Sequence, residues 1–489
     1  MKPSQIFYGF LTALTLTGCT KDFESINTNP NAPSETRPEY HLTEAITQTA
    51  YAYAENGFTR RPAALGRYIT LIRNNDYELF RWTSVDWNDI YSRAMIIKTL
   101  QQEATVTKQP AYVSAAKILM AFNMQYLTDL YGDAPYSKAL QSVENGNIKP
   151  SYDRQEDIYK NLLVVLKEAN AELKSNGTGI DAGADAMFKG DALKWRKLAN
   201  SLRLRMLTRA AKNYPTAYTE IQEIINNKEE YPIMESNADN AEVVYLGVKK
   251  DDSWAGGPLN MIDNDFLKTK ASKELVDALI ARNDPRLELW IAPVASTTGA
   301  TVDSRQYVGI PHAVVNPADY NGGETHQSTL SSYFRQNKPT TLKASLMVYS
   351  EVAFIIAEAM QRNKITVGGS SAETFYNKGI EASMEYYGLT SEAAKRNYYA
   401  QAIVKYNGTL EQVMTQKWLA MTFKGSEGWF DFRRTGFPAF VVGPMAFQKT
   451  FPVRYAWPVS EQNVNLDNYK AAIKVFGADD INTKMWLLQ

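Results

Sequence analysis

Apolar residues recur at intervals of three and four along much of the chain, the spacing that places side chains on one face of an α-helix. Between residues 110 and 132 the pattern is carried by Tyr112, Ala116, Leu119, Phe122, Tyr126 and Leu130. Residues 155–173 repeat it with Ile158, Leu162, Val165, Leu166, Ala169 and Leu173. Both segments are therefore predicted to be amphipathic helices with one buried face.

Capping residues place the starts of two further helices. Asp191 precedes an amphipathic segment, and its carboxylate can accept hydrogen bonds from the first backbone N–H groups of a helix. Asp86 is predicted to cap a helix over residues 87–100 in the same way. Additional helices are predicted over residues 343–362, 372–387 and 410–424.

Strand-like alternation is scarce, and residues 241–248 (AEVVYLGV) are a rare example. The predicted fold class is mainly α, a scaffold of tetratricopeptide-repeat-like (TPR-like) helical hairpins with minor β content. No clean repeat of about 34 residues is visible, so periodicity alone leaves a repeat architecture open.

Glycine, proline, asparagine and aspartate become frequent between residues 232 and 340, as in DDSWAGGPLNMIDND. We interpret this region as a loop-rich, ligand-binding lobe laid on the helical scaffold. Irregular loops on a rigid scaffold are where binding sites tend to lie.

The chain contains one cysteine, Cys19, close to its start. Lys2 and the apolar stretch 6–16 precede it, and that stretch is too short to span a bilayer but fits the hydrophobic region of a signal peptide. The tetrapeptide LTGC that ends at Cys19 resembles a bacterial lipobox, whose thiol receives a diacylglycerol. Several acyl chains together hold a protein firmly on a membrane.

These features predict three parts of the chain. Residues 1–18 are the lipoprotein signal peptide, residues 19–38 a lipidated and polar tether, and residues 39–489 the folded body. No later segment has eighteen consecutive apolar residues, so the body is expected to lie in water beside the membrane.

Composition argues against several classes of partner and site, although histidines far apart in the chain can still converge in a fold. Lys plus Arg equals Asp plus Glu at 53 each, and no basic block is present, which argues against nucleic acid. One cysteine excludes an internal disulfide, and the three histidines have no helical i,i+4 spacing for zinc. No cofactor is predicted; a structural calcium ion stays open, although no EF-hand pattern supports one.

Several motifs, in order, resemble the SusD/RagB family of nutrient-binding outer-membrane lipoproteins. They include DFESINTNPNAPSE (residues 22–35), LTDLYGDAPYSKAL (127–140), WRKLANSLRLRML (195–207) and QKWLAMTFKGSEGWFDFRRTGFP (416–438). Each is weak alone, but their order together with the lipobox is specific, and the resemblance covers nearly all of the mature chain.

The resemblance implies a helical fold with TPR-like hairpins and a non-catalytic role. It also implies a partner, a SusC-like TonB-dependent outer-membrane transporter that the lipoprotein covers as a lid. Ligands in the family are mostly oligosaccharides, with peptides in some members. Asp22 and Glu24, just past the cysteine, resemble the signal that sends such lipoproteins to the exterior face of the outer membrane.

Some residues in these motifs are interpreted as scaffold rather than site. Trp195, Trp418 and Trp429 are predicted to be core residues. Arg433 and Arg434 are expected to clamp loops through ion pairs and hydrogen bonds.

Two stretches have the character of a sugar-binding surface, in which aromatic rings stack on sugar faces and polar groups bind the hydroxyls. The first, RNNDYELFRW, supplies Asn74, Asn75, Asp76, Arg81 and Trp82. The second, DDSWAGGPLN, supplies Trp254, which is either a ligand platform or a plug over the core. Tyr307 is a further candidate.

Two other functions compete with nutrient capture. No GxSxG, HExxH or P-loop motif supports an enzyme, although a carboxylate pair of a glycosidase leaves no motif. The alternative of a structural lid or assembly partner with little ligand binding also stays open, because TPR-like hairpins commonly bind proteins.

Overall fold

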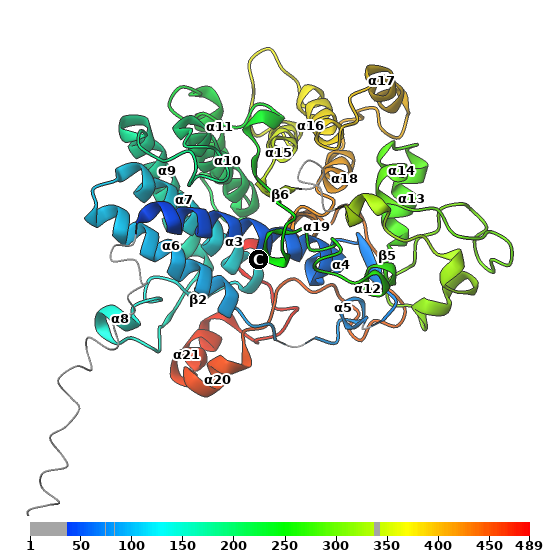
Figure 1. Cartoon of the computed structure of the whole chain (residues 1–489), viewed down its shortest axis with the longest axis horizontal. Coiled ribbons are helices and arrows are strands. Elements are labelled where there is room, and N and C mark those ends of the chain that lie inside the picture. Colours follow the sequence, from blue (N-terminus) through cyan, green and yellow to red (C-terminus); the bar gives the residue numbers. More distant parts are fainter. Residues whose placement is uncertain (1–36, 74, 83, 337–342) are drawn as a thin grey trace, which may run out of the picture. The chain divides into compact units, whose positions relative to one another are not determined.

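Long helices joined by short turns pack side by side and form most of the structure (Figure 1). Residues 37–73, 75–82, 84–336 and 343–489 are described by a computed structural model. Three helical hairpins stand out: α6 (Asn88–Val106) with α7 (Pro110–Tyr131), α9 (Gln155–Asn176) with α10 (Ala192–Ala210), and α15 (Tyr349–Gln361) with α16 (Ala372–Tyr386). The predicted fold class, mainly α with TPR-like hairpins, is confirmed.

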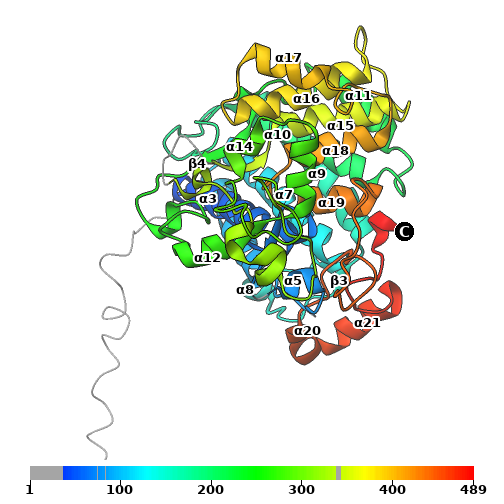
Figure 2. The same cartoon turned by 90° about the vertical axis from the view of Figure 1, so that its right-hand side faces the viewer.

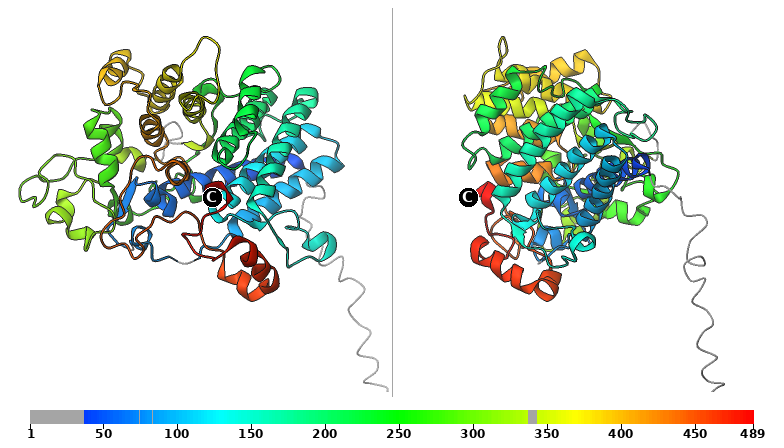
Figure 3. Two further views of the ribbon diagram at one scale, coloured as in Figure 1. Left: turned by 180° about the vertical axis from the view of Figure 1, so that it is seen from behind. Right: turned by 90° about the vertical axis from the view of Figure 1, so that its left-hand side faces the viewer.

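The first two hairpins form a continuous stack, because α7 also packs on α9 (Figure 3, left, blue to green). Helix α18 (Leu410–Ala420) joins the third hairpin and packs on both of its helices (Figure 2). Helix α3 (Pro38–Thr59) runs through the middle of the described chain and contacts both α6 and α7.

Shorter helices fill the remaining chain. They are α4 (Arg61–Leu65), α5 (Asp76–Leu79), α8 (Ser142–Asn145), α11 (Ala217–Asn226), α12 (Asp263–Lys268), α13 (Lys273–Ala281), α14 (Arg286–Trp290), α17 (Glu392–Ala400), α19 (Glu427–Thr435), α20 (Val459–Val464) and α21 (Leu466–Phe476). Six 3-10 helices are also described, and five of them fall between residues 237 and 335, the region with frequent Gly, Pro, Asn and Asp.

The strands form three antiparallel pairs. They are β1 (Ile69–Leu71) with β5 (Thr269–Ala271), β2 (Ala134–Pro135) with β3 (Tyr152–Asp153), and β4 (Ala241–Val244) with β6 (Lys343–Met347). The first pair aligns Leu71 with Thr269 and so brings the segment after α4 against the segment after α12.

Most helix predictions hold, and two starts differ. Asp191 caps α10 by accepting from the N–H groups of Leu193 and Lys194. Helix α6 begins two residues after Asp86, whose carboxylate accepts from the N–H of Asn88 at 2.6 Å. Residues 343–347, predicted to be helical, form a strand, because β4 offers them a pairing partner.

A network of buried ion pairs joins the helices in the core. Arg209 of α10 pairs with Asp129 of α7 and Glu427 of α19, and Arg205 pairs with Glu351 of α15 at 2.6 Å. Burial alone raises the pKa of Glu427, but Arg205 and Arg209 more than offset this and hold it at about 2. The glutamate is therefore ionised, and Arg209 fixes three helices together.

Contacts confirm the scaffold interpretation of the motif at residues 416–438. Arg434 pairs with Glu358 at 2.6 Å and Asp431 at 2.8 Å, and Arg433 donates to the carbonyl oxygens of Val453 and Asp129. Trp195, Trp418 and Trp429 are all buried.

Three predicted features of the N-terminus lie outside the described residues: the signal peptide, Cys19 and most of the tether. Among the described helices, none combines the length and apolar character needed to cross a bilayer.

Candidate functional site

A groove built from two adjoining clefts is the candidate binding site. The first cleft has a volume of about 980 Å³ and the second about 830 Å³. Thr59, Arg60 and Met261 line both clefts, so the clefts are continuous at these residues. Volumes of this size match pockets that enclose small ligands.

The first cleft is assembled where α4, α5 and α12 surround the β1–β5 pair (Figure 1). Leu71 and Thr269, partners in that pair, both line it. The guanidinium of Arg61, the first residue of α4, lies over two aromatic rings, with its Cζ atom 4.9 Å from the ring centre of Tyr77 and 5.3 Å from that of Trp82. These contacts hold a cation at the cleft wall.

Glu78 fixes α5, and with it the residues of α5 that face the cleft. Its buried carboxylate accepts from the backbone N–H of Leu71 in β1 at 2.7 Å. Burial raises the pKa of Glu78 to about 8, because the Leu71 N–H and Arg67 only partly compensate for the loss of water. The glutamate is thus mainly neutral at pH 7 and serves to position α5.

The second cleft carries an aromatic pair. Tyr51 of α3 lines it and stacks on Tyr245, with ring centres 4.6 Å apart and an angle of 25° between the planes. Tyr245 is buried and Tyr51 is half-buried. Such a supported ring next to a cleft is the arrangement that stacks on the apolar face of a sugar.

The 250–261 loop forms one wall of the second cleft and places Trp254 inward. The Asn260 amide donates to the carbonyl oxygens of Lys250 and Ser253, which closes the loop on itself. Trp254 is 4% exposed, and its ring centre lies 4.7 Å from that of Phe58. A Cβ at Gly256 would meet the Phe58 ring at 2.4 Å, so this glycine permits the close approach.

The structure places the Trp254 ring against the core, which is the position that the plug alternative describes. Although Gly256 and Gly257 follow Trp254 in an irregular loop, its ring has packing partners in Phe58 and Tyr245. Contact between Trp254 and a ligand stays a prediction, and the low exposure of the side chain does not support it.

The other predicted site residues are placed in different ways. Asp76 and Arg81 are exposed and line the first cleft, as does Trp82, although only 6% of Trp82 is exposed. Asn75 occupies the N-cap position of α5, and half-buried Tyr307 packs against the core; neither lines the groove. Asn74 lies outside the described residues.

Sequence reasoning missed Arg61, Tyr77 and Tyr51. Tyr77 lies within the stretch RNNDYELFRW, where sequence reasoning names only the amide and charged residues and Trp82 as candidates. Arg61 is the first residue of α4, next to Pro62, and no local pattern marks it as a site residue. Only the fold brings α4 under the α5 segment.

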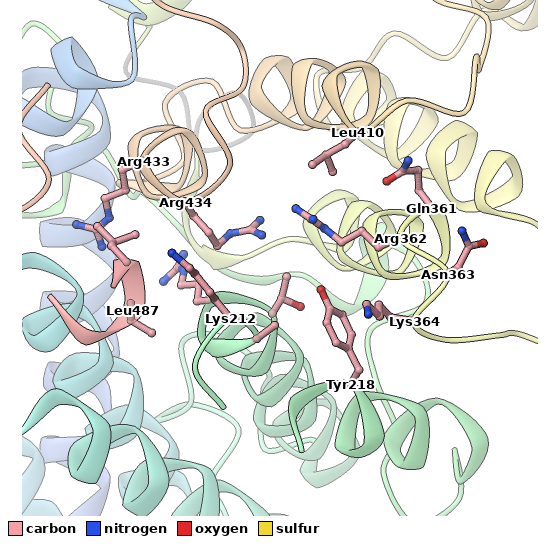
Figure 4. Close-up of a pocket in the computed structure, with 14 residues that line it drawn as sticks. Lys212, Tyr218, Gln361, Arg362, Asn363, Lys364, Leu410, Arg433, Arg434 and Leu487 are labelled. Atoms are coloured by element: carbon pink, nitrogen blue, oxygen red, sulfur yellow. The ribbon is translucent and has the colours of Figure 1, made fainter. Parts of the chain in front are cut away.

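A third cleft, of about 650 Å³, lies among α10, α11, α15 and α19 (Figure 4). Its labelled side chains include Arg362 and Arg434, whose charged ends point toward one another. Arg362 and Arg434 share Glu358 as an ion-pair partner. Tyr218 is its one aromatic lining residue among those described, so it offers less for sugar stacking than the groove.

Within the described part of the chain, no group of three or more His, Cys, Asp or Glu residues is arranged to hold a metal ion.

Comparisons with known proteins identify the family and the fold. A family model described as starch-binding and associating with the outer membrane matches residues 30–458. An outer-membrane protein of Bacteroides vulgatus, described in connection with nutrient binding, has a TM-score of 0.80 and 26% identity, covering 93% of this chain and 100% of that one.

Two further solved structures are similar. A SusD homologue of Bacteroides fragilis has a TM-score of 0.79 and 25% identity, covering 93% of this chain and 100% of its own. A chitin-binding protein has a TM-score of 0.76 and 25% identity, covering 92% and 100%. No protein with a curated description matches the chain.

Proposed function

This chain belongs to the SusD-like family of starch-binding proteins associated with the outer membrane, and we propose from this that it captures an extracellular oligosaccharide and delivers it to a TonB-dependent transporter. The protein carries out no chemical step in this proposal. The family supports binding associated with the outer membrane; the ligand class, the transporter and the exterior location are the proposed parts.

The observation that best supports capture is the groove, whose two clefts meet at Arg60 and Met261. It combines a stacked aromatic residue, Tyr51, with exposed polar residues such as Asp76 and Arg81. Aromatic faces and hydrogen-bonding groups side by side are what an oligosaccharide requires. The chitin-binding protein of similar structure is consistent with a glycan ligand.

Delivery requires that the ligand leave the groove again. Capture is therefore an equilibrium step of modest affinity, since a very tight complex would retain its cargo. Energy for import comes from the transporter, which the lipoprotein covers and to which the ligand passes.

Capture is tested with the chain lacking residues 1–19, which retains all of the compact unit from Pro38 to Gln489. A calorimetric screen against neutral glycans, acidic glycans and peptides is expected to find at least one oligosaccharide ligand, unchanged after long incubation. Peptide binding alone would replace the ligand class. Co-purification with a transporter without any ligand would favour the structural lid, and sustained cleavage would establish an enzyme.

The membrane anchor is proposed to be a lipid on Cys19. Growth of cells with labelled palmitate is expected to label the full-length protein and to leave a Cys19→Ser variant unlabelled. An equally labelled variant would mean that the lipid is attached elsewhere, and an unlabelled wild-type protein would contradict the anchor.

A further inference from the structure

We infer that the groove selects oligosaccharides that carry negative charge, through carboxylate or sulfate groups. This inference rests on the function proposed above and names the class of ligand. It is drawn from an excess of unpaired cations in the first cleft and from the way one of these cations is held.

The first cleft is lined by more cations than carboxylates. The cations are Arg60, Arg61, Arg73, Arg81 and Lys268, and the carboxylates are Asp76 and Asp265. Arg60 is paired outside this set, with Glu55 at 2.7 Å. The chain as a whole has no net charge, so the excess is a local feature of this cleft.

The remaining four cations form no ion pair with any carboxylate among the described residues. Arg73 and Arg81 are exposed, and Lys268 is half-buried. The arginines near the third cleft differ, because Arg362 and Arg434 are matched to Glu358. A ligand in the groove therefore meets cations whose charge the protein leaves unneutralised.

Among these four cations, Arg61 is the one whose guanidinium is held in place by neighbouring aromatic rings. The rings of Tyr77 and Trp82 support its guanidinium, and its buried Nε has no hydrogen-bond partner in the described structure. A guanidinium held in this way loses little freedom when it binds an anion, and it suits the two oxygens of a carboxylate or sulfate. This gives the nearly buried Trp82 a role in supporting the cation beside the ligand.

Acidic glycans fit this cleft better than acidic peptides. The groove continues past Arg60 and Met261 to Tyr51, whose stacked ring suits the apolar face of a sugar. The ligand would thus place a charged group at Arg61 and a sugar ring near Tyr51.

The test compares ligands that differ only in charge. The probes are tetragalacturonate and its fully methyl-esterified form, and a sulfated galactan oligosaccharide and its desulfated form. At least one acidic member is expected to bind about tenfold more tightly than its neutral partner, since one charge-assisted hydrogen-bond pair contributes roughly that factor. Raising the salt concentration should weaken binding of the acidic member selectively.

Variants connect this preference to the cleft. Arg61→Gln and, separately, Arg81→Gln are expected to weaken binding of the acidic ligand about five- to tenfold and to reduce its advantage over the neutral partner. Arg81 is exposed and forms no described ion pair, so this variant keeps the fold if Arg61→Gln does not. Arg154→Gln is the matched control, because Arg154 is an exposed arginine outside the groove.

The outcomes that would overturn charge selection differ from those that would overturn oligosaccharide capture. Equal binding of charged and neutral partners, no binding of any acidic oligosaccharide, or affinity that neither variant alters would overturn charge selection. Capture would survive if a neutral glycan bound in the same screen, and it would fail only if no glycan bound. Selective binding of acidic peptides would also contradict the inference.

Discussion

Replacing Arg209 with methionine is expected to lower the free energy of unfolding by about 3–5 kcal/mol, because it leaves buried Asp129 without its cation and leaves Glu427 with Arg205 alone, 3.8 Å away. Asp129 is fully buried and Glu427 is 3% exposed, so water cannot replace the lost partner. Tyr53 and Tyr159 also donate to these two carboxylates, and their contacts persist in the variant. Chemical denaturation followed by tryptophan fluorescence measures the change.

Lowering the pH should also weaken the buried ion pairs of Arg209 and so reduce the free energy of unfolding. A carboxyl group with a folded-state pKa below its usual value stabilises the protein above the usual value and loses this contribution as the pH falls. For Glu427 the loss falls between about pH 4.5 and 2. In Arg209→Met the pKa of Glu427 rises, so the variant should lose less stability across this range than the wild-type protein.

Two control variants distinguish the loss of the buried ion pairs from the general effect of removing a positive charge. Arg154 pairs with Glu156 at the surface, and Arg154→Met is expected to cause no measurable change. Arg209→Lys keeps one charge but cannot span both carboxylates, so it should lie between wild type and Arg209→Met. A methionine variant as stable as wild type would show that the network does not hold the helices together.

Trp254→Ala is expected to destabilise the protein by about 3–5 kcal/mol, the usual effect of removing a large buried aromatic side chain. The ring fills the space against Phe58 and Tyr245 beneath the groove wall, and its loss leaves a cavity there. Trp254→Phe retains part of the packing and should cost less. Thermal denaturation of the three proteins provides the comparison.

The alternative role for Trp254 has a different signature. A ligand platform would lose affinity on truncation with little change in stability, whereas a core plug loses stability first. Tyr40→Ala is the matched control, since Tyr40 is an aromatic residue of α3 that is 65% exposed. If Trp254→Ala kept its stability but lost affinity for the glycan, Trp254 would be a ligand-binding residue rather than a core plug.

Local pattern was sufficient to predict the helical scaffold. The spacing of apolar residues located α7 and α9, and Asp191 located the start of α10, because these features depend on neighbours within a turn of helix. Residues 343–347 defeated the same reasoning, since their strand exists only through pairing with β4.

The candidate site was predictable only in part for a similar reason. The stretch around Asp76 and Arg81 was identified from its residue types, and both residues line the groove. Arg61 becomes a candidate only when the fold lays its guanidinium over Tyr77 and Trp82. The position of Trp254 depends on contact with Phe58, a residue far away in the chain, so no local pattern could distinguish plug from platform.

Hydrogen–deuterium exchange, with and without the tightest-binding oligosaccharide from the screen, tests most directly that the ligand occupies the groove. The account predicts slower exchange in the segments around Arg60, Tyr77 and Met261, which line the two clefts. Protection confined to the segments around Lys212 and Arg362, at the third cleft, would contradict it.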